Sequence, residues 1–435
     1  MKKSIYYSII EIDNKRLLIY NALQDKYLSC AKEEWQAFEN GLDITPIFLD
    51  KLHEIGLLID DDINESDIAK NLMDEVDQDP TILLVHVNPT LQCNLNCWYC
   101  YENHIPSSKM QPETVNAVIR YMHNRLEDDR IKHLQLAFFG GEPLLYFNDV
   151  VKPLISAAKE LAENSGIPFS VHFTSNATLL NENIIGFLKP FNVSFQITLD
   201  GGKEAHDKVR HMKGVGTYEL ILKNIMRLAT TGKRVVLRVN FTADNVDTVP
   251  AILDEIAGWP SEIKSNIHID LQQVWQDIGK DNEDNISNKI HLMMETAASN
   301  GFAISSPWKA TNIKHSCYGD KLNHILINYN GDLYFCTARD FKPENRKGYL
   351  SEDGYPVWEN DSLRKHMSVK FSNPTCRNCR IGPLCGGGCR QKAYETMGRS
   401  GCPLGFTEYD KDDIILKRFE RFIIVPRIKP LNLNN

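Results

Sequence analysis

The 435-residue chain is predicted to adopt an α/β fold, a partial (β/α)6 barrel of the TIM type, with a winged-helix-like domain before it and a cysteine-rich domain after it. Three observations favour this division. Residues 81–310 alternate apolar strand-like runs with amphipathic helical stretches, which is typical of parallel strands joined by right-handed crossovers. Residues 1–80 combine short strands with polar helices, and residues 311–410 hold seven of the eleven Cys. Residues 411–435 are expected to form a C-terminal helix and tail.

The first 80 residues begin with two strands that a turn at Asp13-Asn14-Lys15 joins as a hairpin. Two helices, a short strand and a third, polar helix follow, and Gly56 ends the second helix. Short strands followed by helices and a returning strand suggest a winged-helix unit. The expected strands span residues 5–12, 16–20 and 57–59, and the expected helices span residues 32–38, 45–55 and 64–76.

Six strand-like runs and the helices between them make up the barrel segment. The helix expected over residues 112–126 has Pro112 near its start, and the helix expected over residues 218–230 ends before Gly232. In barrels of this type the active site lies at the C-terminal ends of the strands, so we expect functional residues directly after the runs. The runs are residues 83–87, 134–139, 169–174, 193–199, 235–241 and 267–274.

Composition argues against several functional classes. The 49 basic and 57 acidic residues give a net charge of −8, so no nucleic-acid partner is expected. No apolar run approaches the ~18 residues of a membrane span and the N-terminus lacks a signal-peptide core, so we expect no membrane partner and a cytoplasmic location. Eleven Cys in such a chain favour metal ligation over disulfides, and the isolated Cys30 is expected to be a buried small hydrophobic residue.

Three Cys follow the first barrel strand, Cys93, Cys97 and Cys100, with three and then two residues between them. Such thiols can bind one metal centre as thiolates, and they supply three ligands where a cubane iron–sulfur cluster has four irons. The fourth iron would be open to a ligand that is not protein. The alternatives are three unrelated buried Cys or a structural zinc site, which requires four protein ligands and for which His104 is a candidate.

Polar and glycine-rich motifs follow the next three strands. The second strand is followed by Gly-Gly-Glu-Pro, in which the glycines allow close backbone approach to a ligand and the carboxylate can accept from an ammonium group. An arginine beyond the fourth strand could pair with a carboxylate, or be a surface charge. The candidate residues at these strand ends are Gly140, Gly141, Glu142, Pro143, Ser175, Asn176, Thr198, Asp200 and Arg210.

The Cys loop, with the aromatic Tyr99 before its third Cys, and the Gly-Gly-Glu-Pro motif resemble the motifs of the radical S-adenosylmethionine (SAM) enzymes. The resemblance implies that the three Cys hold a 4Fe–4S cluster whose open iron binds the amino and carboxylate groups of SAM. It further implies that Glu142 holds the SAM amino group and that Tyr99 and the other strand-end candidates bind the cofactor. Cleavage of SAM would give a 5′-deoxyadenosyl radical that abstracts a hydrogen from the substrate. Ala177 and Thr198 depart from the family, which has Gly and Ser at these places.

The seven C-terminal Cys resemble the SPASM domain of radical SAM peptide maturases, which carries auxiliary 4Fe–4S clusters. With the SAM-binding cluster this implies three clusters in all. Two auxiliary clusters need eight ligands, so either a non-Cys group such as His315 or Asp320 supplies the last one, or one iron is open, in which case we expect it to bind substrate. The alternative is a zinc site of Cys376, Cys379, Cys385 and Cys389. The resemblance assigns Cys376, Cys379, Cys385 and Cys402 to one cluster, and Cys317, Cys336 and Cys389 to the other.

Together these resemblances predict an enzyme that oxidatively modifies a ribosomally made peptide, installing a thioether, carbon–carbon or ether cross-link. The N-terminal domain resembles one that binds a leader peptide as an added strand. The expected partners are a precursor peptide with a leader and an electron donor such as flavodoxin or ferredoxin. One alternative is an anaerobic sulfatase-maturing enzyme, which makes formylglycine; against it stand the N-terminal domain and Thr337, which replaces a catalytic Asp and leaves Asp340 displaced. Another is a non-catalytic metal-binding regulator.

Overall fold

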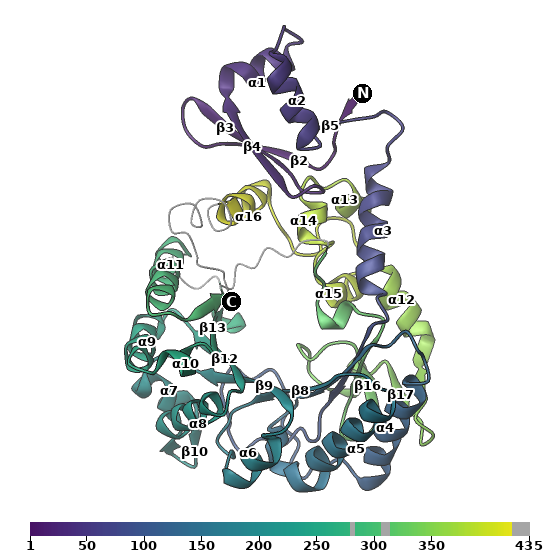
Figure 1. Cartoon of the computed structure of the whole chain (residues 1–435), viewed down its shortest axis with the longest axis vertical. Helices are drawn as coiled ribbons and strands as arrows, with labels where there is room; N and C mark the ends of the chain where they lie inside the picture. Colours follow the sequence, from purple (N-terminus) through teal and green to yellow (C-terminus); the bar gives the residue numbers. More distant parts are fainter. Residues whose placement is uncertain (279–282, 306–313, 420–435) are drawn as a thin grey trace. The chain divides into compact units, whose positions relative to one another are not determined.

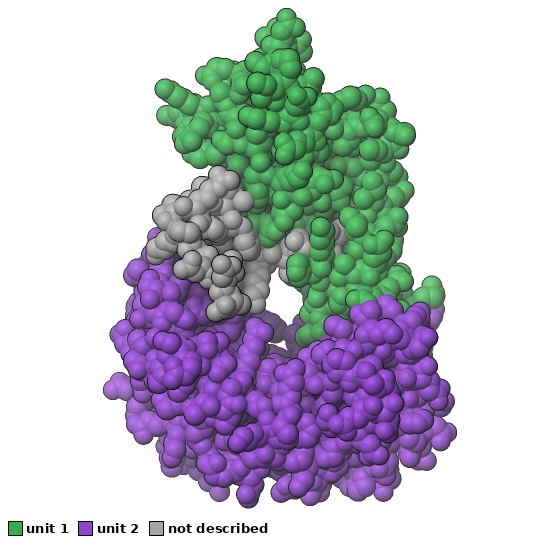
Figure 2. Space-filling view, in the orientation of Figure 1, with its two compact units in different colours: residues 1–79, 310–322, 363–435 green, residues 80–309, 323–362 purple. Residues whose placement is uncertain are grey.

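The computed structural model describes residues 1–278, 283–305 and 314–419 of the chain. The chain forms two compact units, each assembled from separate segments (Figures 1 and 2). Unit 1 contains residues 1–79, 310–322 and 363–435, and unit 2 contains residues 80–309 and 323–362. Within the described ranges, no helix is both long enough and apolar enough to span a membrane. The tail expected beyond residue 419 lies outside the described residues.

Unit 2 is built on a mixed eleven-stranded sheet. The six strands predicted for the barrel are confirmed: they are parallel and lie next to one another in sequence order. At one end β14 continues the parallel sheet, and at the other β15 pairs with β6 and leads into three antiparallel strands. The strands are β6 (Ile82–Val87), β7 (His133–Phe138), β8 (Phe169–Ser175), β9 (Asn192–Leu199), β12 (Arg234–Phe241), β13 (Ile267–Gln273), β14 (Ala303–Ser305), β15 (His324–Ile327), β16 (Asp332–Tyr334), β17 (Gly348–Leu350) and β18 (Pro356–Trp358).

Helices that connect the parallel strands lie outside the curve of the sheet (Figure 1). In α8 (Tyr218–Thr230) the buried residues Ile221, Leu222, Ile225 and Leu228 recur at helical spacing, so one face of the helix packs into the core of unit 2. The predicted start of α4 (Pro112–Arg125) at proline is confirmed. The other connecting helices are α5 (Lys152–Asn164), α6 (Glu182–Leu188), α7 (Lys203–Val209), α9 (Val249–Ala257), α10 (Ser261–Lys264) and α11 (Glu283–Ser299).

Strands β15 to β18 place part of the cysteine-rich segment in the sheet of unit 2. The physical reason is β15, whose four residues are all buried and pair in parallel with Leu84–Val87 of β6. Cys336 follows β16 and belongs to unit 2, whereas the other six C-terminal Cys belong to unit 1. The compact units therefore cross the segment boundary expected at residue 310.

The N-terminal part of unit 1 contains a three-stranded antiparallel sheet in the order β2–β3–β4. The sequence analysis missed β4 (Lys26–Ala31), because its mixed polar residues lack an alternating pattern; it pairs with all of β3. Cys30 in β4 is 7% exposed and packs with Trp35 and Leu52, which confirms its prediction as a small core residue. The remaining elements are β1 (Lys2–Lys3), β2 (Tyr7–Glu11), β3 (Arg16–Asn21), α1 (Lys32–Glu39), α2 (Pro46–Glu54), β5 (Leu58–Ile59) and α3 (Glu65–Asp77).

Unit 1 has a second core that joins its N-terminal and C-terminal segments. Fully buried Tyr6 donates its hydroxyl to the Arg377 carbonyl, between Cys376 and Cys379, over 2.8 Å. This core combines Tyr6, Ile10, Tyr20, Ala22, Ala69 and Met73 with Phe371, Ile381, Leu384 and Ile415. The C-terminal helices are α12 (Ser362–Ser368), α13 (Pro374–Arg377), α14 (Gly382–Cys385), α15 (Arg390–Glu395) and α16 (Glu408–Phe419).

Candidate active site

The loop after β6 brings its three Cys together. Burial raises the pKa of the Cys93 thiol to about 12 and that of the Cys100 thiol to about 11, and in both cases the nearby Cys97 thiol adds to the rise. The three thiols are thus close enough to act on one another electrostatically. A positive metal centre that holds thiols as thiolates would remove this mutual penalty, so the donor set fits an iron–sulfur cluster.

The zinc alternative named His104 as a fourth ligand. His104 Nε2 lies 3.5 Å from Cys100 Sγ. Among the residues that the structure describes, no three His, Cys, Asp or Glu side chains lie close enough together to bind a single metal ion. A four-iron cluster does not require that, because each thiolate binds a different iron.

A buried polar network holds Tyr99, which precedes Cys100. The Tyr99 hydroxyl donates to Asp200 Oδ2 over 2.6 Å, and it accepts from Arg210 Nη2 at 2.7 Å and from Asn240 Nδ2 at 3.1 Å. Arg210 Nε donates to Asp200 Oδ2 over 3.0 Å, and both residues are buried. Burial disfavours the charged guanidinium, but Asp200 and Tyr99 outweigh it and hold the pKa of Arg210 well above its usual value. This "Tyr99 clamp" (Tyr99, Asp200, Arg210, Asn240) fixes the Cys loop to the ends of β9 and β12.

The sequence analysis assigned three members of this clamp to SAM binding. In the structure, Tyr99, Asp200 and Arg210 hydrogen-bond to one another, and these bonds hold the Cys loop against the strand ends. Thr198 is half-buried and paired in register with Arg238 across β9 and β12. SAM contacts of these residues stay a prediction.

His206 connects the backbone segments that carry Asp200 and Arg210 of the Tyr99 clamp. Its Nδ1 accepts from the backbone N–H of Asp200 at 3.2 Å, so the proton is on Nε2, which lies 3.1 Å from Thr217 Oγ1. Thr217 Oγ1 in turn donates to the Arg210 carbonyl over 2.7 Å. Burial lowers the pKa of His206 to about 3. The neutral ring therefore joins the two segments that supply the Asp200–Arg210 ion pair.

Glu142 of the Gly-Gly-Glu-Pro motif is fully buried and ties the ends of β7 and β8 together. Its carboxylate accepts from Leu144 N at 3.1 Å, Ser175 Oγ at 2.8 Å and Asn176 N at 2.7 Å. Pro143 begins the short helix that Glu142 caps. Burial raises the pKa of Glu142 to about 7, although all three donors oppose the rise. The expected acceptor for an ammonium group is thus already engaged by protein donors.

The two glycines of this motif are required by close packing. A Cβ on Gly141 would lie 2.2 Å from the Gln92 carbonyl oxygen, and one on Gly140 would lie 2.7 Å from Asn88 Cβ. Both have positive φ, at 45° and 80°. The neighbour that excludes a side chain is the segment leading into Cys93, so the glycines seat the Cys loop.

Asn176 connects the end of β8 to the Cys loop. Its Nδ2 donates to Asn94 Oδ1 over 2.8 Å and lies 3.7 Å from Cys93 Sγ. Ala177 has φ 60°, a left-handed conformation that favours glycine. This explains why the family has Gly where this chain has Ala177.

Three residues near the Cys loop escaped the sequence analysis. Glu102 Oε2 accepts from Gly141 N at 2.7 Å, and burial raises the Glu102 pKa to about 7. Gln276 donates to the Tyr99 carbonyl over 2.8 Å, and Asn94 bonds Asn176 as above. Their positions after the first and last strands were the only available signal, because an isolated amide or carboxylate has no diagnostic spacing.

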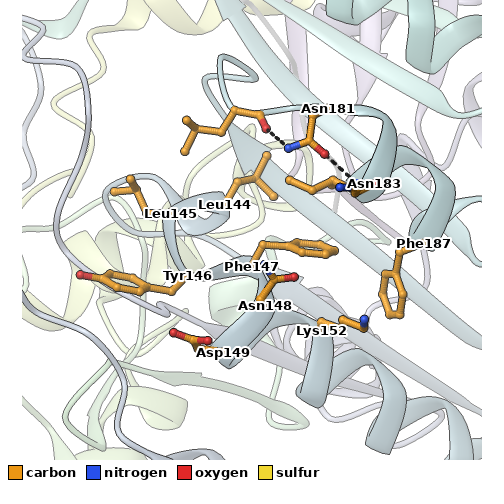
Figure 3. Close-up of a pocket in the computed structure, with 12 residues that line it drawn as sticks. Leu144, Leu145, Tyr146, Phe147, Asn148, Asp149, Lys152, Asn181, Asn183 and Phe187 are labelled. Atoms are coloured by element: carbon orange, nitrogen blue, oxygen red, sulfur yellow. Dashed lines mark hydrogen bonds between the residues drawn. The ribbon is translucent and has the colours of Figure 1, made fainter.

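A surface pocket of about 430 Å³ lies beside these loops, between the segments that follow β7 and β8 (Figure 3). It is lined by Leu144–Asp149 and Lys152 on one side and by residues from Leu179 to Phe187 on the other. None of the predicted site residues lines it. The candidate chemistry is therefore not in this pocket.

Four C-terminal Cys line one small cavity in unit 1: Cys376, Cys379, Cys385 and Cys402. Burial raises the pKa of Cys385 to about 12, and the other three thiols add to the rise. Gly387 and Gly388 also line this cavity, both with φ 76°. Four mutually close thiols around one space fit a four-iron cluster. The structure thus groups the same four residues that the family resemblance assigned to one cluster.

Of the Cys assigned to the other auxiliary cluster, Cys317 and Cys389 belong to unit 1 and Cys336 belongs to unit 2. The two candidates for an extra, non-Cys ligand of this cluster differ in their surroundings. His315 is exposed, whereas Asp320 is 5% exposed and forms an ion pair with Lys370 Nζ over 2.7 Å. Asp320 also lies near Arg390, which follows Cys389 and is ion-paired with Asp77. This buried set of two acids and two bases makes Asp320 an unsuitable ligand, because binding iron would leave Lys370 without its nearest counter-charge.

Comparison with known proteins agrees with this geometry. Residues 87–256, which contain the Cys loop and the Tyr99 clamp, match the model of the Radical SAM superfamily. The radical SAM cyclopropyl synthase TigE of Paramaledivibacter caminithermalis is 23% identical, over 92% of this chain and 89% of its own length. The cysteine-type anaerobic sulfatase-maturating enzyme of Clostridium novyi is 26% identical, over 69% of this chain and 85% of its own.

Among solved structures, Streptococcus suis SuiB bound to its precursor peptide SuiA has a similar fold. The TM-score is 0.52 at 14% identity, and the match covers 92% of this chain and 97% of SuiB. A radical SAM domain uses a 4Fe–4S cluster and SAM, and the thiols after β6 suit that cluster. The match over residues 87–256 and the three neighbouring thiols after β6 together identify this part of the chain as a Radical SAM domain.

Proposed function

We propose that this protein oxidatively modifies a ribosomally synthesised precursor peptide, installing a thioether, carbon–carbon or ether cross-link. The observation that carries the proposal is the pairing of two sites in one chain: three grouped thiols after β6, and four thiols around one cavity in unit 1. SuiB, whose structure was solved with its precursor peptide SuiA bound and whose match covers 92% of this chain, supports a peptide substrate.

In this proposal Cys93, Cys97 and Cys100 hold the SAM-binding cluster. When bound, the cluster and SAM supply abstraction of a hydrogen atom from an unactivated carbon. The Tyr99 clamp holds the loop that carries these thiols, and Glu142 and Asn176 fix the neighbouring strand ends. The rigid arrangement keeps the reacting groups in place without rearrangement during the reaction.

Cys376, Cys379, Cys385 and Cys402 hold one auxiliary cluster in the proposal, and Cys317, Cys336 and Cys389 hold another. These clusters would accept the electron that a net oxidation releases, while a flavodoxin or ferredoxin supplies the electron that cleaves SAM. The leader of the precursor pairs with β2 or β4, the outer strands of the N-terminal sheet, as in a winged-helix recognition domain.

The test is anaerobic coexpression of the full chain with the short peptides encoded beside its gene. Mass spectrometry should show loss of two hydrogens per cross-link in one of them, and tandem spectra should locate the link. A variant with Cys93, Cys97 and Cys100 replaced by Ala is the control and should release no 5′-deoxyadenosine. An unshifted mass with every neighbouring peptide would contradict cross-linking.

Sulfatase maturation is the second candidate, since the Clostridium novyi enzyme is 26% identical to this chain. The same preparation, incubated with SAM, reductant and a sulfatase-derived Cys peptide, separates the two. Formylglycine on that peptide would favour sulfatase maturation. We expect none, because Thr337 stands where that reaction needs an Asp.

A further inference from the structure

The cavity formed by Cys376, Cys379, Cys385 and Cys402 contains one charged residue among those that line it in the described part of the chain, Lys411 of α16. The other lining residues are small or apolar, among them Ile381, Leu404 and Phe406. A cation in such surroundings is poorly screened by water. Its charge therefore acts strongly on whatever the four thiols hold.

Lys411 is held in place by its own helix. Its side chain is 13% exposed, and its Nζ lies 2.5 Å from Glu408 Oε1, one helical turn earlier. The Glu408 side chain is 70% exposed and also accepts from Arg380 Nε at 2.9 Å. Because the carboxylate faces water and shares its charge with Arg380, it compensates Lys411 only in part.

Lys411 and the four thiols line the same cavity, and the contact with Glu408 keeps the ammonium group there. A cation at this position would stabilise the added negative charge of a reduced cluster. Net charge near a cluster and its solvent exposure are the protein's main means of setting its potential.

We propose that the positive charge of Lys411 raises the reduction potential of the auxiliary cluster held by Cys376, Cys379, Cys385 and Cys402. The inference rests on the proposed function, in that these four Cys must hold a cluster. It assigns to α16 a role in making this cluster a better acceptor of the electron released by substrate oxidation.

The experiment is an EPR-monitored redox titration, with dithionite and mediators, of the full chain carrying Cys93→Ala, Cys97→Ala and Cys100→Ala so that only auxiliary clusters contribute. Lys411→Gln should leave the iron content unchanged and lower one midpoint potential, so that the reduced-to-oxidised ratio at fixed potential falls about tenfold, equivalent to ~59 mV. Lys411→Arg keeps the charge and should stay near the parent. Lys417→Gln is the matched control, because Lys417 lies on the same helix, pairs with Asp413 and does not line the cavity.

An unchanged potential in an iron-replete Lys411→Gln variant would overturn the inference. If that variant loses iron, the Glu408→Gln variant tests the inference instead. It removes the counter-charge of Lys411 and should raise the same midpoint potential, and an unchanged potential would overturn the inference. Absence of iron and sulfide from the parent protein would instead refute the proposed function itself. The two failures are therefore distinguishable.

Discussion

Removal of residues 1–75 is expected to destroy the four-thiol cavity while sparing the barrel. The deletion removes the N-terminal residues of the second core of unit 1. The side chains left exposed are Phe371, Ile381, Leu384 and Ile415, each of which is at most 1% exposed in the intact chain. Exposing a large apolar side chain costs about 1.5–3 kcal/mol, so four cost about 6–12 kcal/mol. That loss matches the whole stability of a typical domain, about 5–15 kcal/mol. Unit 2 keeps its own core and the Cys loop.

Iron and sulfide analysis of anaerobically purified protein measures the outcome. We expect iron to fall from roughly twelve to roughly four atoms per chain, with SAM cleavage to 5′-deoxyadenosine retained and peptide modification lost. Tyr6→Ala is the point variant and should weaken the same core by about 3–5 kcal/mol, as for other large aromatic truncations. A truncated protein that retains about twelve irons would refute the reasoning, because the N-terminal segment would then not support the cluster cavity.

Three further predictions concern the loops of unit 2. Glu142→Gln replaces one oxygen of a carboxylate that accepts from three donors with an NH2 group. It should lower the free energy of unfolding by about 1–3 kcal/mol, measured by thermal unfolding. It should also lower the affinity for SAM, measured by equilibrium binding. Tyr99→Phe removes the hydroxyl shared by three partners and should cost a similar amount while loosening the Cys loop; unchanged stability and cluster EPR would argue against the clamp. His206 has a folded pKa of about 3, below its unfolded value, so the unfolded chain binds more protons and stability falls as pH drops from about 6.5 towards 3. This amounts to about 2 kcal/mol at pH 5, and denaturant titrations at pH 7 and pH 5 should show that loss in the parent and not in His206→Gln.

The chemistry-bearing motifs could be predicted because they are local in sequence. Cys93, Cys97 and Cys100 are close in the chain, so their spacing alone limits how they can share a metal centre. The Gly-Gly-Glu-Pro motif was found in the same way, but its interpretation changed: Gly140 and Gly141 pack against the Cys loop, and Glu142 accepts from protein donors. The cause is that a strand-end motif contacts its neighbouring strand ends, which its own sequence does not contain.

The sequence by itself determined the parallel strands, the helices between them and the grouping of the Cys in motifs, since apolar periodicity and residue spacing act within a few turns of the chain. Tertiary structure alone decided which distant residues meet. Tyr99 reaches Asp200 and Asn240 across 101 and 141 residues, and Tyr6 reaches Arg377 across 371. Such pairs form because packing satisfies buried polar groups and apolar surface over the whole unit, and no local pattern encodes their partners.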